Sequence, residues 1–314
     1  MWLELYTIFG ACGIIGRVKI RPWLQLFRLP NLPTAPGDAL AGAAVLMCFS
    51  AGGLAQAVAA GATALGFYMF GLADNDIVGA PTDGQERPIP RGDISMRAAR
   101  AARALCLVGA CLVGACARMP SAWWGAALAL VGTVLAYNRT KGKWLMGLCR
   151  GLSVVCGAFA VWRPACDWKA IGALACLAGG WTLYGTAITW LSEGEEQESE
   201  GLGHAAVLWG LTVVVPGFIM GFIEGSALGY RVALPGIAGL LGYVYWLAAV
   251  IEPLAKPHGP DVRRQAVGRA VRVFLYLQVG CMLVAPCREF VLLAAALWVA
   301  SRIARRIAPE ISGS

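Results

Sequence analysis

The sequence predicts an all-α integral membrane protein of about nine transmembrane helices, and three observations lead to this fold class. Hydrophobic residues make up 58% of the 314 residues and charged residues 14%, with a mean hydropathy of +0.65. A soluble core of this length uses far less apolar side chain, so the excess must meet lipid. No charge occurs from Ala39 to Ala73, which is long enough for a hairpin of two spans. The 40 Gly allow close helix approach, as at Gly147 and Gly151.

Apolar runs between polar loops place the predicted spans. They cover residues 32–49, 53–73, 98–117, 122–137, 144–162, 169–191, 205–223, 232–251 and 266–285. No soluble domain or heptad repeat interrupts them, so we predict one polytopic membrane domain, 32–303. It follows an apolar, interfacial N-terminal segment with a basic stretch, 1–31, and precedes a basic tail, 304–314. The apolar stretch Phe290 to Ala300 is too short for a full span.

Basic residues gather at alternate ends of the predicted spans and indicate the orientation. Lys and Arg recur within 17–28, 87–103, 139–143 and 256–272, and cations of short loops stay on the cytoplasmic side. The basic tail 302–306 fits this rule only if the stretch before it re-enters as a tenth span; otherwise the tail breaks the rule. The net charge of +8 is spread over loops without an aromatic stacking pattern, so no nucleic-acid partner is expected.

One of the basic loops, 74–92, carries carboxylates and an amide followed by arginines. Asn75, Asp76 and Asp83 supply hard oxygen ligands of the kind that Mg²⁺ prefers, and Arg87 supplies a guanidinium for phosphate oxygens. These residues indicate a site for a Mg²⁺-bridged diphosphate. A solvated loop of turn-forming residues has the same composition, and the residues by themselves leave both interpretations open.

Three further polar groups lie beside or within the fourth and fifth predicted spans. Tyr137 and Lys141 are one helical turn apart, so both can reach a phosphate; the alternative is an aromatic-belt Tyr beside orientation-setting cations. Arg150 lies inside the fifth span. Because an intramembrane Arg is costly, it predicts a polar cavity or an anion facing it.

The loop 192–200 concentrates five Glu. A solvated acidic loop explains its far end. Glu193 and Glu195 lie nearest the membrane, where they are placed to hold a second metal opposite Asn75 and Asp76.

Taken together, these residues resemble the UbiA superfamily of intramembrane prenyltransferases, from about Arg28 to about residue 285. The first signature of that family is an Asn-Asp pair followed by Asp three and seven residues after the Asp of the pair, and then by Arg-Pro. The matching residues are Asn75, Asp76, Asp83, Arg87 and Pro88, and Tyr137 and Lys141 match the Tyr-x-x-x-Lys element.

Two departures from the family pattern are visible. Gly79 stands where the middle Asp of the first motif belongs, and the segment before Arg87 is shorter than usual. The second Asp-rich motif is replaced by residues 189–195. Together with residues 146–151, these departures look closest to the EboC-like branch of the family.

The resemblance implies a UbiA-type bundle around a lipid-accessible cavity and transfer of a polyprenyl group, with the help of Mg²⁺, from a polyprenyl diphosphate to an aromatic or other small polar acceptor. Catalysis is then expected of Asp76, Asp83 and Lys141, metal binding of Asn75, Asp76, Asp83, Glu193 and Glu195, and substrate binding of Arg28, Arg87, Tyr137, Lys141 and Arg150. Gly79 and the missing motif favour a rival class, a UbiA-like protein that binds or transports a lipid or hydrophobic precursor. A structural subunit of a membrane complex is a third alternative.

Overall fold

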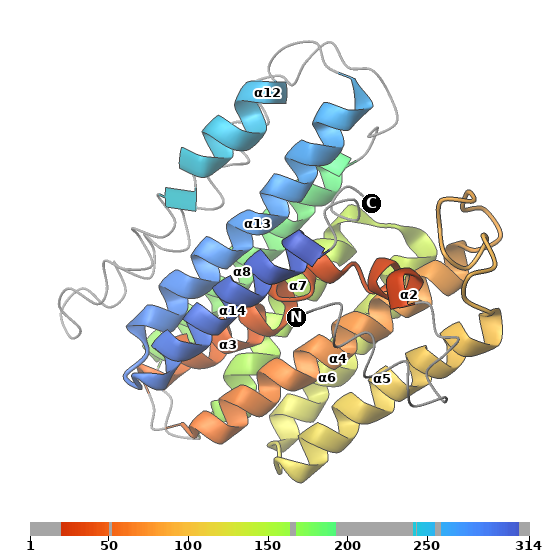
Figure 1. The fold of residues 1–314 in the computed structure, drawn as a ribbon. Helices are drawn as coiled ribbons and strands as arrows, with labels where there is room; N and C mark the ends of the chain where they lie inside the picture. The colour runs from red at the N-terminus through yellow and green to blue at the C-terminus, as the bar shows by residue number, and fades with distance from the viewer. Residues whose placement is uncertain are drawn as a thin grey trace, which may run out of the picture.

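The computed structural model describes residues 20–49, 52–163, 168–192, 241–242, 244–254 and 259–307, and within these ranges it contains helices and no strands. The elements are α2 (Ile20–Leu26), the 3₁₀-helix η1 (Leu29–Asn31), α3 (Thr34–Met47), α4 (Leu54–Gly79), α5 (Met96–Cys116), α6 (Ser121–Thr140), α7 (Lys143–Val161), α8 (Trp168–Ser192), the π-helix η4 (Leu247–Ile251), α12 (Glu252–Leu254), α13 (Pro260–Val284) and α14 (Glu289–Ile307). The long helices lie alongside one another in a bundle (Figure 1).

Five of the described helices, α4, α5, α7, α8 and α13, are long and apolar enough to cross a membrane. Their bounds follow the predicted apolar runs, but the prediction of nine spans is not confirmed. The predicted span 205–223 and half of 232–251 lie outside the described residues. The surface of the bundle supports a lipid environment, because Leu105, Leu128 and Leu292 are 72%, 74% and 71% exposed. The protein is therefore an integral membrane protein.

The centre of the bundle is formed by α3 and α7. Helix α3 packs against α4, α7 and α13, while α7 packs against α6 and α8. Small residues allow this closeness: a Cβ added at Gly147 would overlap the Thr182 carbonyl oxygen, and one at Gly151 would overlap the Thr182 hydroxyl oxygen. The backbones of α7 and α8 are therefore in contact, as predicted for this pair of glycines.

Helix α14 extends further than the apolar stretch Phe290–Ala300, which the sequence analysis found too short for a full span. It continues through the basic tail to Ile307, because arginines are good helix formers whose charged ends can reach away from the apolar face. It turns back at residues 285–288 and packs along α13, with the Trp298 and Tyr276 rings 5.4 Å apart, and it also contacts η1 and α3. The basic end of α14 thus lies beside the middle of α13 (Figure 1).

Candidate functional site

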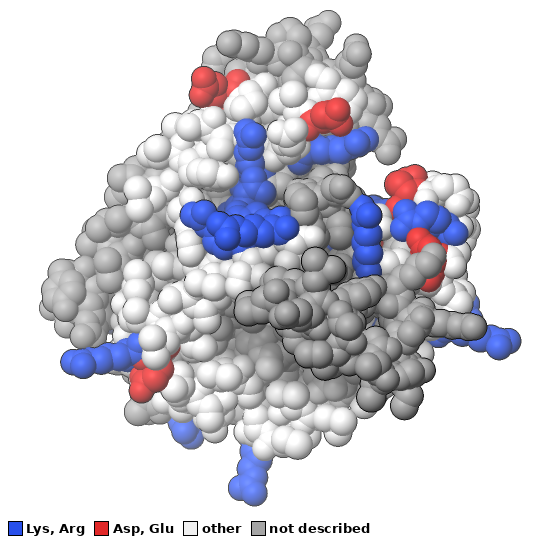
Figure 2. Space-filling view, viewed as in Figure 1, with Lys and Arg blue, Asp and Glu red and all other residues white. Residues whose placement is uncertain are grey.

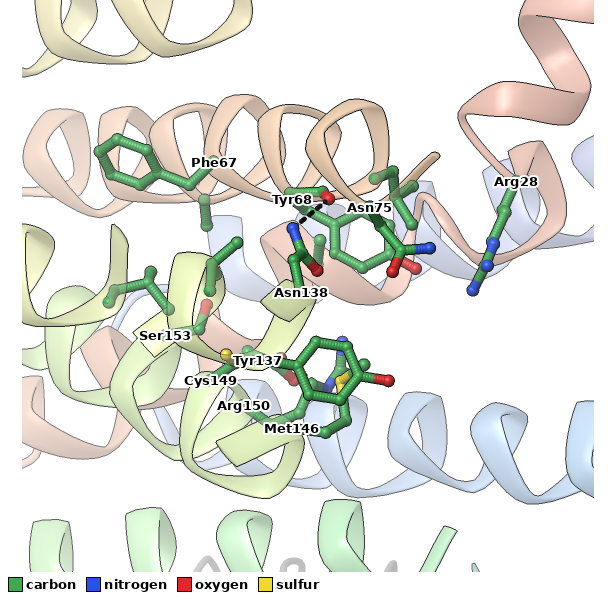
Figure 3. Close-up of a pocket in the computed structure, with 17 residues that line it drawn as sticks. Arg28, Phe67, Tyr68, Asn75, Tyr137, Asn138, Met146, Cys149, Arg150 and Ser153 are labelled. Carbon is green, nitrogen blue, oxygen red and sulfur yellow. Dashed lines mark hydrogen bonds and ion pairs between the residues drawn. The ribbon is translucent and has the colours of Figure 1, made fainter. Parts of the chain in front are cut away.

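A cavity of about 120 Å³ lies between α3, α4, α6 and α7 (Figure 3). The residues that line it are Arg28, Ala35, Asp38, Ala64, Phe67, Tyr68, Gly71, Leu72, Asn75, Leu130, Val134, Tyr137, Asn138, Met146, Cys149, Arg150 and Ser153. Four of the residues predicted to bind metal or substrate are among them, namely Arg28, Asn75, Tyr137 and Arg150. Residues that are far apart in the sequence therefore meet at one place.

The cavity has a polar end and an apolar end. Figure 3 shows Arg28, Asn75 and the hydroxyl group of Tyr137 at one end, and Phe67 and Ser153 towards the other. The walls between are largely apolar, with Leu130 from α6 among the lining residues. A molecule with a charged head and an apolar tail matches this distribution.

Helix α4 ends at the polar end, and its last turn carries Asn75 and Asp76. The ammonium of Lys141 donates a hydrogen bond to the Asn75 side-chain oxygen. Arg87 Nη1 lies 3.9 Å from Asp76 Oδ1. Asp76 is 2% exposed, and within the described part of the chain its Oδ1 atom has no hydrogen-bond donor. A buried carboxylate oxygen without a donor is an available ligand for a cation.

Asp83 is brought back onto the end of α4 by a tight turn. The backbone amides of Thr82 and Asp83 donate to the Gly79 carbonyl at 2.9 and 2.8 Å. A Cβ added at Gly79 would lie 2.5 Å from Asp83 Oδ2. The carboxylate of Asp83 thus fills the space that a side chain at position 79 would need, which gives a physical reason for glycine where the family motif has Asp.

The loop that follows α4 is anchored to the N-terminal part of the chain. Gln25 donates to the Glu86 carbonyl at 2.8 Å, and Arg91 Nη2 donates to the Gln25 side-chain oxygen at 3.0 Å. A small apolar cluster beneath the loop includes Leu26 and Ile89. Helix α2 therefore holds in place the segment that carries Asp83 and Arg87.

Asp74 belongs to a separate network. Its carboxylate accepts from Arg103 Nη1 at 2.7 Å and from Asn138 Nδ2 at 2.9 Å, and Asn138 also donates to the Gly71 carbonyl at 3.1 Å. These contacts join α4, α5 and α6. Each carboxylate oxygen of Asp74 accepts a hydrogen bond, whereas Oδ1 of Asp76 accepts none from the described residues.

Arg28 precedes η1 in a left-handed backbone conformation, with φ of 45°. Such a conformation is unfavourable for a residue with a side chain and is held only where the surroundings require it. The side chain lines the cavity, and its buried Nε atom has no acceptor among the described residues. The backbone of Arg28 thus presents a cation donor to the polar end.

The intramembrane Arg150 has a partner that the sequence analysis missed. Its Nε atom lies 3.0 Å from Asp38 Oδ2, and its guanidinium stacks 4.0 Å from the centre of the Phe274 ring. The other oxygen of Asp38 accepts from Trp181 Nε1 at 2.8 Å and from Gln278 Nε2 at 2.6 Å. Asp38 was overlooked because it directly precedes the charge-free stretch; the signal was a carboxylate inside an apolar span in a chain with an intramembrane Arg.

The pKa of Lys141 depends on Asp76, Asp83 and Arg87, so these predicted residues also lie near the polar end. Burial lowers the pKa of the Lys141 ammonium from its ordinary value, the nearby Asp83 carboxylate raises it, and Arg28 lowers it again, with smaller opposing effects of Asp76 and Arg87. Lys141 itself is in a left-handed conformation, with φ of 54°, where it ends α6. Two carboxylates and three cations therefore interact around one point.

The oxygen ligands at the polar end fit Mg²⁺ that is also held by substrate phosphates and water. Among the described residues there is no group of three His, Cys, Asp or Glu that could enclose a metal ion. Mg²⁺, however, is usually held by one or two carboxylates together with substrate phosphates and water. Asn75, Asp76 and Asp83 provide such a partial set, and the orphaned Asp76 oxygen supports it. Glu193 and Glu195 lie outside the described residues.

No family model and no curated protein matches the sequence. The structure matches a UbiA homologue from Archaeoglobus fulgidus at 10% identity, with a TM-score of 0.59, over 88% of this chain and 98% of that one. The chain has the UbiA fold. A structure of a digeranylgeranylglyceryl phosphate synthase in membranes also matches, at 15% identity and a TM-score of 0.56, over 88% of this chain and 99% of that one. The UbiA fold predicted from the motifs is thus confirmed.

Proposed function

We propose that this protein is an intramembrane prenyltransferase that acts on a polyprenyl diphosphate. The observation that carries the proposal is the meeting of Asn75, Asp76 and Asp83 with Arg28 and Lys141 at the polar end of an otherwise apolar cavity. The UbiA fold supports the same function, since one of its solved examples is a digeranylgeranylglyceryl phosphate synthase. A diphosphate joined to an apolar chain fits both ends of the cavity.

In this proposal the charged residues bind and orient the diphosphate. Mg²⁺, when bound, neutralises phosphate charge and assists departure of the leaving group. Asn75, Asp76 and Asp83 hold the metal, and Arg28, Arg87 and Lys141 contact phosphate oxygens. Because these groups are already ordered around the place where negative charge develops, they stabilise the departing diphosphate without reorganising.

The apolar walls have a different role. Phe67, Leu130 and Val134 line the apolar part of the cavity, where the isoprenoid chain would lie. They exclude water, which would otherwise capture the allylic cation before a small aromatic or polar acceptor does. The ring of Tyr137, which also interacts with the Lys141 ammonium at 5.7 Å, offers its electron-rich face to the same region.

A carrier of lipids or hydrophobic precursors is the second candidate. Gly79 favours it, because the carboxylate of Asp83 occupies the space of the missing motif residue. Against it stands the strained Arg28 and the orphaned Asp76 oxygen, since a carrier for neutral lipids has no need of either.

The test is Mg²⁺-dependent release of diphosphate from geranylgeranyl diphosphate by the purified protein in detergent. Asp76→Asn and Asp83→Asn keep the shape of each side chain and remove its charge, and each should lower the rate by about 100-fold or more. Asp261→Asn is the control, because Asp261 is 88% exposed and its only ion pair among the described residues is with Arg264 on its own helix, at 3.7 Å. Saturable binding with no metal-dependent release in the unmodified protein would support the carrier instead.

A further inference from the structure

A second cleft, of about 380 Å³, lies away from the cavity. It is formed by α13, α14 and the segment before η4, and none of its lining residues lines the cavity. Four arginines, Arg272, Arg302, Arg305 and Arg306, contribute to it. Figure 2 shows Lys and Arg gathered on this face where α14 ends.

Three aromatic rings form the wall beside these arginines. Tyr245 and Tyr276 are 5.5 Å apart, Tyr276 and Trp298 are 5.4 Å apart, and the Arg302 guanidinium lies 5.7 Å from the Trp298 ring. Tyr and Trp are the side chains that membrane proteins place at the level of lipid headgroups. The cleft therefore combines interfacial aromatic residues with a concentration of positive charge.

Within the described part of the chain, none of the four arginines has a carboxylate at ion-pair distance. The arginines also repel one another: Arg302 and Arg306 are four residues apart on α14, a spacing at which like charges destabilise a helix. Arg272 and Arg305 are partly buried, which adds a cost of desolvation. An anion in the cleft would relieve both costs.

The apolar stretches next to these arginines are shorter than a full membrane span. Uncharged segments of twelve residues, 273–284 and 290–301, extend from the arginines on α13 and α14. Each is about 18 Å long as helix, shorter than the hydrocarbon core of about 30 Å. Local thinning of the bilayer around such short stretches would draw lipid headgroups towards the arginines.

We propose that this cleft binds the headgroup of an anionic phospholipid, with Arg302 and Arg305 on the phosphate and the aromatic wall against the glycerol region. A basic pocket between membrane helices is the type of site at which anionic lipids bind. The lipid would act as a bound structural ligand that joins α13 to α14.

The test is native mass spectrometry of the full-length protein in detergent, titrated with dioleoylphosphatidylglycerol and, in parallel, with dioleoylphosphatidylcholine. The variant Arg302→Gln/Arg305→Gln should bind the anionic lipid about 30-fold more weakly, and Arg306→Gln alone, at an exposed position, about fivefold more weakly. The control is Arg97→Gln/Arg100→Gln on α5, where both residues are exposed, and its affinity should match that of the unmodified protein.

Equal binding of the two lipids, or equal loss in the α14 and α5 variants, would overturn the proposal. Inorganic phosphate added at the same concentration distinguishes a lipid site from a general anion site, and full displacement of the lipid by phosphate would also count against it. If the double variant does not stay monodisperse, Arg306→Gln decides, because its side chain lies at the exposed rim.

Discussion

Removal of the Asp38 carboxylate should be among the most damaging single changes in the described core. Asp38 is 1% exposed, and Arg150, whose side chain is 12% exposed, would remain buried without its anion. The indole of Trp181 would also lose its acceptor, and the amide of Gln278 would keep only the Thr34 carbonyl oxygen. One broken buried ion pair costs about 3–5 kcal/mol, so with the orphaned donors we expect Asp38→Ala to lower the free energy of unfolding by about 5 kcal/mol.

The complementary changes separate charge from hydrogen bonding. Asp38→Asn keeps an acceptor for both donors and should cost about 3 kcal/mol. Arg150→Ala should also cost about 3 kcal/mol, because Asp38 keeps two donors. In the double variant Asp38→Ala/Arg150→Ala neither charge is stranded, so the loss should stay near about 5 kcal/mol, which gives a coupling energy of about 3 kcal/mol.

The measurement is SDS-induced unfolding in mixed micelles, followed by circular dichroism. Losses that add to about 8 kcal/mol in the double variant would show that the two side chains act independently. That result would refute the assignment of Asp38 as the anion for Arg150.

Three further predictions concern helix packing, pH and the metal. Gly151→Ala should cost about 1–3 kcal/mol in the same assay, because its methyl group would overlap the Thr182 hydroxyl oxygen, whereas Gly132→Ala, which has open space, should stabilise by about 0.5–1 kcal/mol. Burial lowers the folded-state pKa of Lys141, so the rate of diphosphate release should fall at a pH below the ordinary lysine value, and Lys141→Arg should move this fall to higher pH. Gly79→Asp should lower severalfold the Mg²⁺ concentration for half-maximal release, since it adds a carboxylate beside Asp83.

Each of these predictions has an outcome that contradicts it. Destabilisation by Gly132→Ala equal to that by Gly151→Ala would mean that the α7–α8 contact does not decide the result. If the fall in rate at high pH does not move in Lys141→Arg, a group other than Lys141 is responsible for it. Gly79→Ala displaces the Asp83 carboxylate without adding a ligand, so a Mg²⁺ requirement as low as that of Gly79→Asp would refute the metal argument.

The lowered pKa of Lys141 also predicts how stability depends on pH. Because Lys141 keeps its proton to higher pH in the unfolded state than in the folded state, the free energy of unfolding should rise as the pH increases from the folded to the unfolded pKa value.

The sequence was informative wherever a long apolar run or a spaced motif decided the structure. Helices α4, α5, α7, α8 and α13 follow the predicted runs because lipid leaves the chain no alternative to helix once a run is apolar and long. Asn75 and Lys141 were both selected from motifs, and their hydrogen bond joins segments that the sequence alone could not place together.

The side of each helix that faces the cavity could not be predicted in the same way. In a helix that is apolar nearly all round, periodicity does not distinguish the cavity side from the lipid side. Asp38, inside the predicted span 32–49, was therefore not selected. The motif selected Asp76 and not Asp74, but it did not predict that Asp74 pairs with Arg103 while Asp76 faces Arg87. The extent of α14 was missed because its last turns carry Arg305 and Arg306, which a hydropathy criterion excludes.

The attachment of α2 to the loop after α4 has a consequence for where this protein functionally begins. A chain that started at residue 32 would keep every predicted span and the whole apolar part of the bundle. It would lack Gln25, which holds Glu86 and Arg91, and Arg28, which lines the cavity. Such a truncated protein should still insert into membranes and fold, while the segment with Asp83 and Arg87 would lose its support. On the proposed function, membrane insertion and competence for diphosphate binding should therefore be separable properties, and the segment with Gln25 and Arg28 should contribute to the second.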